Sequence, residues 1–175
     1  MTVRFTMFCL TMIGLLSFPL AACHQSTGKK WYDKKLFGQN IKTKFDTSNT
    51  AFIAFDEASS YLFDKNCKAT VLTNNDLIII DNLLIQCVND YNKNLSPKFK
   101  NLSIDLAGNS YKRQIISVIN NNGDKEVWLN CFCSMYDKRW KTDVLTVEDG
   151  GSCFFNLKLN LTNKTFYHLL VNGVV

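Results

Sequence analysis

Three cysteines in the C-terminal half of the chain, Cys131, Cys133 and Cys153, are the residues best suited to chemistry. Cysteines that face each other on neighbouring strands of a sheet can form a disulfide. We expect a Cys133–Cys153 disulfide, and a Cys131–Cys153 bridge and a second bridge between Cys67 and Cys87 stay open as alternatives. A disulfide persists in an oxidising compartment, and the N-terminal segment of the chain predicts export to one.

The N-terminal segment, residues 1–22, has the layout of a bacterial export signal. Arg4 precedes an apolar run over residues 5–20, which is short for a membrane span, and two alanines follow. The sequence Leu20-Ala21-Ala22-Cys23 resembles the lipobox of bacterial lipoproteins, which implies acylation of Cys23. Because several acyl chains anchor a protein stably, we expect attachment to a membrane through this lipid. A signal with an incidental cysteine is the alternative.

Residues 23–45 are expected to form a polar tether of low hydrophobicity. The tether is rich in lysine, and these lysines either form a solvated spacer or rest on anionic headgroups beside the anchor: Lys29, Lys30, Lys34, Lys35, Lys42 and Lys44. By the sorting habits of enteric lipoproteins, the absence of Asp after Cys23 favours the outer membrane.

The composition indicates one mildly basic domain over residues 46–175. The formal charge of +5 falls to +4 when residues 1–22, which hold Arg4 and no acid, are removed. The charge is spread evenly, so we do not expect nucleic acid as a partner. Aromatic residues make up 13% of the chain, enough for one sizeable core. Five cysteines follow Cys23, an odd number, so at least one has no intramolecular partner.

Catalytic and metal-binding side chains are scarce in this sequence. The chain has two histidines, His24 and His168, and lacks the common nucleophile, metal and phosphate-loop motifs. Zinc held by the three C-terminal thiols and His168 is an alternative, although structural zinc sites usually space their cysteines more widely than Cys-x-Cys. We therefore expect no metal, no cofactor and no enzymatic activity.

A long amphipathic helix is predicted from Thr73 to about Lys93. Thr73 and Asp76 have the spacing of a capping box, and Ser96-Pro97 ends the pattern. Apolar residues at spacings of three and four predict one face packed on a sheet: Leu77, Ile80, Leu84, Cys87 or Val88, and Tyr91. Four more apolar residues are expected to widen this face: Ile78, Ile79, Leu83 and Ile85.

The C-terminal half predicts an antiparallel meander. Runs over residues 111–119 and 125–134 flank Asn122-Gly123, which as a two-residue turn would pair Ile116 with Leu129. Strand 152–159 is aligned by the cysteine pair, so that Leu129 faces Leu157, and strand 165–171 follows. One face is then almost wholly apolar and should lie under the helix: Ile116, Val118, Val127, Leu129, Phe155, Leu157 and Leu159.

One helix followed by four antiparallel strands predicts an α+β domain, with a long helix packed on a curved four-stranded meander in a cystatin-like or NTF2-like arrangement. Four motifs occur within it: YKRQ at residues 111–114, VWLNCFC at 127–133, DGGSCFFNLK at 149–158 and VNG at 171–173. From Leu72 to the C-terminus, these motifs resemble a group of small bacterial envelope proteins with no assigned activity. The resemblance implies the fold and the compartment only.

The sheet face away from the helix is the predicted binding surface. By the same registers it carries aromatic, Arg and Asn side chains, a composition typical of recognition surfaces: Arg113, Ile115, Trp128, Asn130, Phe132, Phe154, Asn156 and Lys158, with Trp140 extending it from the following loop. We expect a protein or peptide partner. A small ligand or glycan in a cleft between helix and sheet is the runner-up. Alternatively, residues 52–63 fold back and cover these aromatic side chains.

Overall fold

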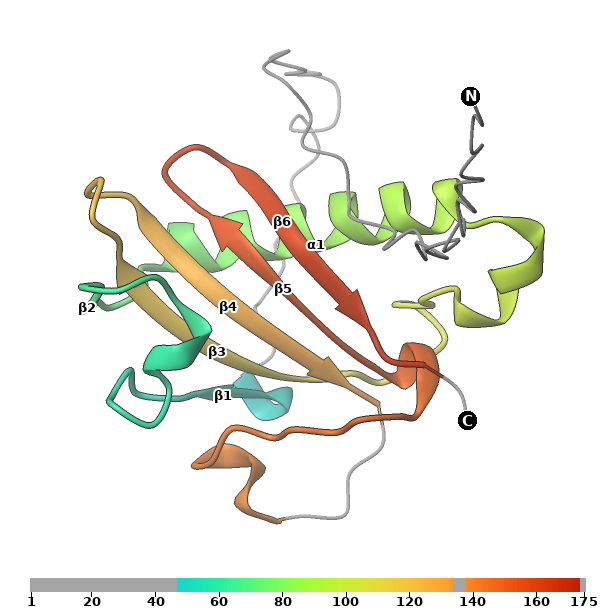
Figure 1. Cartoon of the computed structure of the whole chain (residues 1–175), viewed down its shortest axis with the longest axis horizontal. Helices are drawn as coiled ribbons and strands as arrows, with labels where there is room; N and C mark the ends of the chain where they lie inside the picture. The colour runs from blue at the N-terminus through green and yellow to red at the C-terminus, as the bar shows by residue number, and fades with distance from the viewer. Residues whose placement is uncertain (1–46, 134–137, 174–175) are drawn as a thin grey trace, which may run out of the picture.

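The computed structural model describes residues 47–133 and 138–173, and in it one long helix lies across an open, mixed sheet (Figure 1). The strands lie in the order β1 (Thr50–Phe52), β3 (Lys112–Ile119), β4 (Lys125–Phe132), β5 (Phe154–Asn160) and β6 (Thr165–Val171), and β2 (Lys68–Ala69) also pairs with β3. The predicted α+β class and the antiparallel meander from β3 to β6 are confirmed. The predictions for residues 1–45, Cys23 included, lie outside the described residues.

The helix α1 (Asn74–Asn94) begins where the sequence predicts. Asp76 N–H donates to Thr73 Oγ1, and the Asp76 carboxylate accepts from the Thr73 backbone, so the capping box is formed. The inner side of the helix is buried against the sheet through Ile80, Leu83, Leu84, Cys87 and Val88. Two residues expected to widen this face, Ile78 and Ile85, are instead 47% and 49% exposed on the outer side.

The predicted register between β3 and β4 is wrong by one residue. Ile116 pairs with Trp128 rather than Leu129, because the hairpin loop has three residues instead of two. Gly123 N–H donates to Asn120 O, and Asn120 N–H donates to Asp124 O. Gly123 takes a φ of +82°, a left-handed conformation that glycine adopts without steric cost. The register between β4 and β5 is as predicted, with Leu129 opposite Leu157.

The shift of one residue turns β3 over, because side chains alternate between the two faces of a strand. Ile115 packs under the helix with Val127 and Leu129, whereas Ile116 and Val118 belong to the opposite face. Both faces of β3 are buried, so neither face could be assigned to solvent from the pattern of apolar residues.

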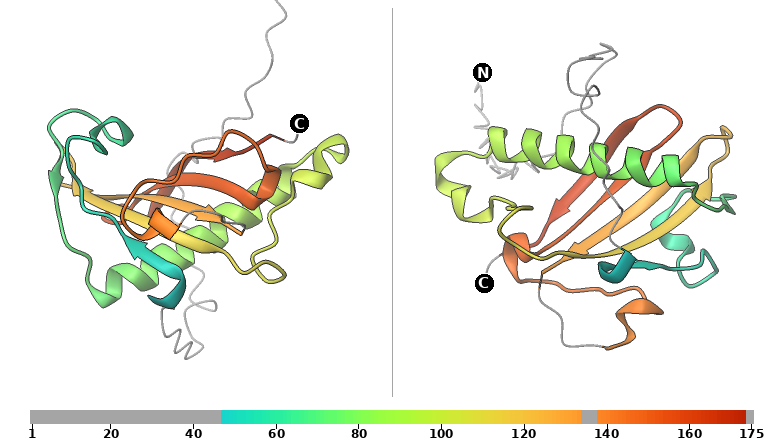
Figure 2. Two further views of the ribbon diagram at one scale, coloured as in Figure 1. Left: turned by 90° about the horizontal axis from the view of Figure 1, so that it is seen from below. Right: turned by 180° about the vertical axis from the view of Figure 1, so that it is seen from behind.

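The face away from the helix is covered by chain segments that pair with or contact strand β3. β1 runs parallel to β3 and β2 antiparallel to it, and residues 53–67 between them pass over the sheet (Figures 1 and 2). Phe63 in this segment packs with Ile116, Val118 and Trp128. The 3-10 helix η4 (Lys138–Lys141) and the chain after it cover the other end of the same face.

Candidate functional site

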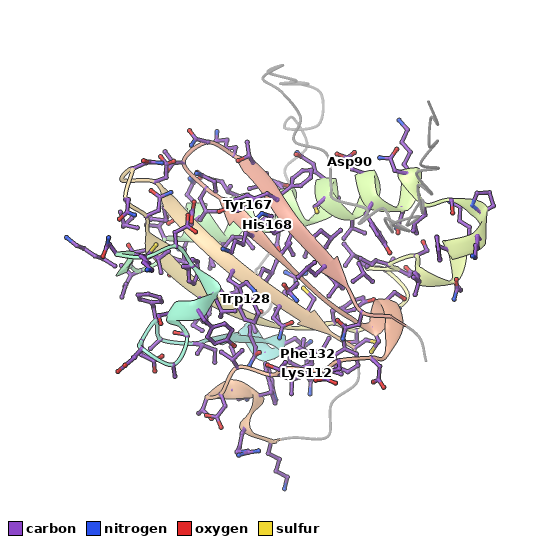
Figure 3. The ribbon with its side chains drawn as sticks, in the orientation of Figure 1. Asp90, Lys112, Trp128, Phe132, Tyr167 and His168 are labelled. Atoms are coloured by element: carbon purple, nitrogen blue, oxygen red, sulfur yellow. A yellow bond between two sulfur atoms is a disulfide. The ribbon has the colours of Figure 1, made fainter. Side chains whose placement is uncertain are left out.

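Six of the predicted surface residues share the face away from the helix, including Lys158, which pairs with Trp128. Trp128, Asn130 and Phe132 come from β4, where Asn130 pairs with Asn156 of β5 and Phe132 pairs with Phe154. Figure 3 shows Trp128 near the middle of this face and Phe132 toward the end where β4 stops. The sequence therefore predicted correctly that these six residues lie on one face of the sheet.

Arg113 is not part of this face, contrary to the prediction. Because β3 is turned over, Arg113 points toward the helix and forms an ion pair with Asp81 of α1. Both side chains are partly buried, at 26% and 19% exposure. Ile115 lies in the core under the helix for the same reason. Arg113 therefore serves the contact between helix and sheet.

Phe132 and Trp140 are core residues and not an exposed recognition surface. Phe132 is 0% exposed and Trp140 is 5% exposed. Their rings meet edge to face, with centroids 5.7 Å apart and planes at 79°, and both pack against Ala51 of β1. The alternative that residues 52–63 fold back over the aromatic side chains holds for Trp128, which packs with Phe63, whereas Phe132 is buried mainly by Trp140 and Ala51.

Two buried amides hold the loop after η4 against the sheet. Gln114 Nε2 donates to the carbonyl oxygens of Trp140 at 2.6 Å and Asp143 at 2.7 Å, and Gln114 Oε1 accepts from Leu145 N–H at 2.9 Å. Asn130 Nδ2 donates to Gln114 Oε1 at 3.1 Å and to Leu145 O at 2.9 Å. Asn130 was predicted to contact a partner, yet its amide is used within the fold. Gln114 lies in the YKRQ motif but was not predicted as part of the site.

Between this loop and the segment around Tyr61 the cover is incomplete, leaving a cavity of about 230 Å³. The sheet contributes Trp128, Asn130, Phe154 and Asn156, which are four of the predicted binding residues. The rest of the lining comes from the two covering segments, from β6 and from neighbouring residues: Tyr61, Leu62, Val144, Leu145, Thr146, Val147, Phe155, Leu170 and Asn172. Most of the lining is apolar or aromatic, so the cavity suits an apolar group.

Two apolar side chains that line the cavity remain largely in solvent. Tyr61 is 68% exposed and Leu170 is 58% exposed. Neither residue was predicted, because their exposure depends on how η2 (Ser60–Leu62) and β6 pack and not on a local pattern. Asn156, which pairs with Leu170 across β5 and β6, makes no side-chain hydrogen bond to any other described residue. Its amide is therefore available to a bound group.

A second group of polar side chains lies on the same face near the start of β4. Glu126 is buried and accepts a 2.8 Å hydrogen bond from Asn120 Nδ2. Burial, followed by the charge of Glu126 and its hydrogen bond, raises the pKa of Tyr167. Burial and then the nearby carboxylates of Glu126 and Asp64 raise the pKa of Cys67. A thiol with a raised pKa is a poor nucleophile, so this group does not have the electrostatics of a reactive cysteine site.

The remaining cysteines also act as structural residues. Cys133 and Cys153 are joined with an S–S distance of 2.16 Å, as predicted. Cys131 lies in the core under the helix, where burial raises the pKa of its thiol to about 12. Cys67 and Cys87 lie on opposite sides of the sheet, so the alternative bridge between them does not form.

The zinc alternative is wrong because two of its thiols are oxidised to a disulfide. Among the residues that the structure describes, no group of three or more His, Cys, Asp or Glu side chains could hold a metal ion. Over the same residues, no helix is both long and apolar enough to cross a membrane. His168 is exposed in β6 at an irregularity of the strand pairing and takes a φ of +52°.

Comparisons with protein-family models, with curated proteins and with solved structures find no match to this chain.

Proposed function

We propose that this chain is a lipid-anchored protein of the bacterial cell envelope, attached through Cys23 to the outer membrane, whose domain binds a protein or peptide without catalysing a reaction. The export signal and lipobox support the anchor. The raised thiol pKa values of Cys67 and Cys131 support a binding role over a thiol enzyme. The helix lying across a meander supports a cystatin-like or NTF2-like arrangement, to which β1 and β2 are additions.

The observation that carries the proposal is the cavity lined in part by Tyr61 and Leu170. Exposed apolar side chains beside an aromatic-walled hollow are typical of sites where one partner inserts an anchoring side chain. Small-molecule pockets usually measure about 300–1,000 Å³, and this cavity is smaller. The size favours a single apolar side chain of a partner over a whole ligand.

A small ligand or glycan is the second candidate, and the Asn156 amide favours it. This amide is one of the polar groups of the cavity that make no hydrogen bond to another described residue, and it lies on the same face as the ring of Trp128. A few polar groups in an apolar pocket orient a small ligand. The cavity between covering loops and sheet replaces the cleft between helix and sheet that the sequence suggested.

Site-specific photo-crosslinking in cells tests the protein-binding proposal. A photoreactive phenylalanine analogue replaces Tyr61 or Leu170, and Ile85 on the outer side of α1 is the matched control because it is also apolar and half exposed. We expect the same protein adduct from positions 61 and 170 and none from position 85. The adduct should be lost when Thr146→Trp fills the cavity. Equal adducts from all three positions, or none, would contradict the proposal.

A further inference from the structure

Four cationic side chains gather around Trp140. Lys112 of β3 and Lys141 of η4 hold their Nζ atoms 5.2 Å and 5.5 Å from the centre of the Trp140 ring. Lys138 and Arg139 are exposed in the same short helix. Because the Trp140 ring is fixed in the core, the two ammonium groups near it are held at a defined place on the surface. We call these four residues the Trp140 cluster.

Among the residues that the structure describes, little negative charge balances the Trp140 cluster. Residues 138–147 contain one acidic residue, Asp143. Its Oδ2 lies 4.0 Å from Arg139 Nε, and both side chains are largely exposed. An exposed pair of this kind is weak. The pairs between Arg113 and Asp81 and between Lys125 and Asp76 are more buried. The three lysines of the cluster therefore present net positive charge to their surroundings.

The cluster lies close to the point where the chain enters the domain. The described chain begins with η1 (Thr47–Asn49) and β1, and Ala51 of β1 packs with Phe132 and Trp140. Residues 23–46, which precede it, contain six lysines and two aspartates. In the proposed lipoprotein, these residues connect the acylated Cys23 to this end of the domain. Both the segment after the anchor and the cluster therefore carry net positive charge.

We propose that the Trp140 cluster rests on anionic phospholipid headgroups and thereby sets which side of the domain faces the membrane. Each Lys or Arg near an anionic membrane surface raises partitioning about five-fold, so the three lysines of the cluster are enough to orient an already anchored domain. The position of the cluster beside the tether rests on the proposed anchor, whereas its positive charge depends neither on the anchor nor on the cavity.

Vesicle sedimentation of the unacylated protein tests the electrostatic contact without the anchor. The chain from residue 23 with Cys23→Ala is mixed with vesicles of phosphatidylcholine, with or without phosphatidylglycerol. A Lys138→Glu, Lys141→Glu variant is compared with Lys98→Glu, Lys100→Glu in η3 (Pro97–Leu102), which lies at a distant part of the molecule (Figures 1 and 2). Both pairs are exposed lysines in a 3-10 helix, and both variants change the net charge equally.

We expect binding that requires phosphatidylglycerol and weakens with salt. The partition coefficient should fall at least about 20-fold for the variant in η4, from two cations at about five-fold each, and less than about 3-fold for the variant in η3. An equal fall in both variants, binding that does not depend on phosphatidylglycerol, or tighter binding to duplex DNA at the same phosphate concentration would overturn the proposal. Circular dichroism of both variants checks that they fold.

Discussion

The Asn130 amide donates a 3.1 Å hydrogen bond to Gln114 Oε1, and this pair joins β4 and β3 beneath the loop that forms one side of the cavity. Both amides also bond to the backbone of that loop. These two buried amides therefore fix the loop and so the shape of the cavity. The cavity exists because the loop is bound to the sheet at defined backbone groups.

Replacing Gln114 with Ala should lower the free energy of unfolding by about 3 kcal/mol, because it leaves buried polar groups of the loop without partners. Asn89→Ala on the exposed side of α1 is the matched amide control, and we expect a change within about 0.5 kcal/mol. Urea unfolding measures both. Amide hydrogen exchange should also quicken at Leu145. A Gln114 variant as stable as the control would contradict this role.

The ion pair between Arg113 and Asp81 provides a test of the register of β3. In the register predicted from sequence these side chains lie on opposite sides of the sheet, whereas in the structure they are in contact. A double-mutant cycle with Arg113→Ala and Asp81→Ala should give a coupling free energy of about 1 kcal/mol, as for a partly exposed pair. A coupling indistinguishable from zero would contradict the register.

Reduction of the disulfide between Cys133 and Cys153 should destabilise the fold by about 3 kcal/mol, the chain-entropy value for a loop of this length. The two cysteines are 20 residues apart and enclose η4 and the loop beside the cavity. Urea unfolding with and without reductant should show this loss in the wild type and in Cys67→Ser. A Cys133→Ser, Cys153→Ser variant should not respond to reductant. Equal response of all three proteins would contradict the assignment.

Asp76 should make stability depend on pH in the acid range. Burial acts to raise the pKa of Asp76, but hydrogen bonds from Lys125 and Thr73 outweigh it and hold the pKa below its ordinary value. A carboxyl with a lowered pKa stabilises the fold above its unfolded pKa of about 4, and this stabilisation is lost as the pH falls through the folded pKa.

Asp76→Asn should therefore lower the free energy of unfolding by about 1–2 kcal/mol at pH 7. The difference from the wild type should shrink steadily as the pH is lowered below about 4. Urea unfolding at a series of pH values measures this. The exposed Asp90 on the same helix provides the control, since Asp90→Asn should give no comparable pH-dependent loss. A difference for Asp76→Asn that stays constant from pH 7 to pH 2 would count against the assignment.

The strand whose register was predicted correctly is one in which buried residues alternate with more exposed ones. Strand β5 alternates between buried and partly buried residues, and the pairing of Cys133 with Cys153 aligns it so that Leu129 lies opposite Leu157. β3 contains Ile115 and Ile116 side by side, both buried, so its sequence is equally consistent with either register. The Asn-Gly pair indicates a hairpin but does not determine whether the loop has two or three residues.

The residues of the candidate site that the sequence predicted all come from strands of the sheet. Trp128, Asn130, Phe154 and Asn156 share a face by alternation, so their grouping could be predicted, while their role in binding stays a prediction. The cover depends on β1 pairing with β3 about sixty residues later in the chain, a contact that no local pattern specifies. Tyr61 and Leu170 line the cavity only because of how the covering segments lie on the sheet, so their role could not be predicted from the sequence.

Peptide display on the purified domain tests the central claim, that the cavity binds an apolar side chain of a protein partner. We expect selection from a random library to enrich peptides with one large apolar residue at a fixed position. Binding should be lost in Thr146→Trp, which fills the cavity from its exposed wall, and kept in Ile85→Ala on the far side of the molecule. Peptides that bind Thr146→Trp as well as the wild type, or a selection with no apolar anchor, would contradict the claim.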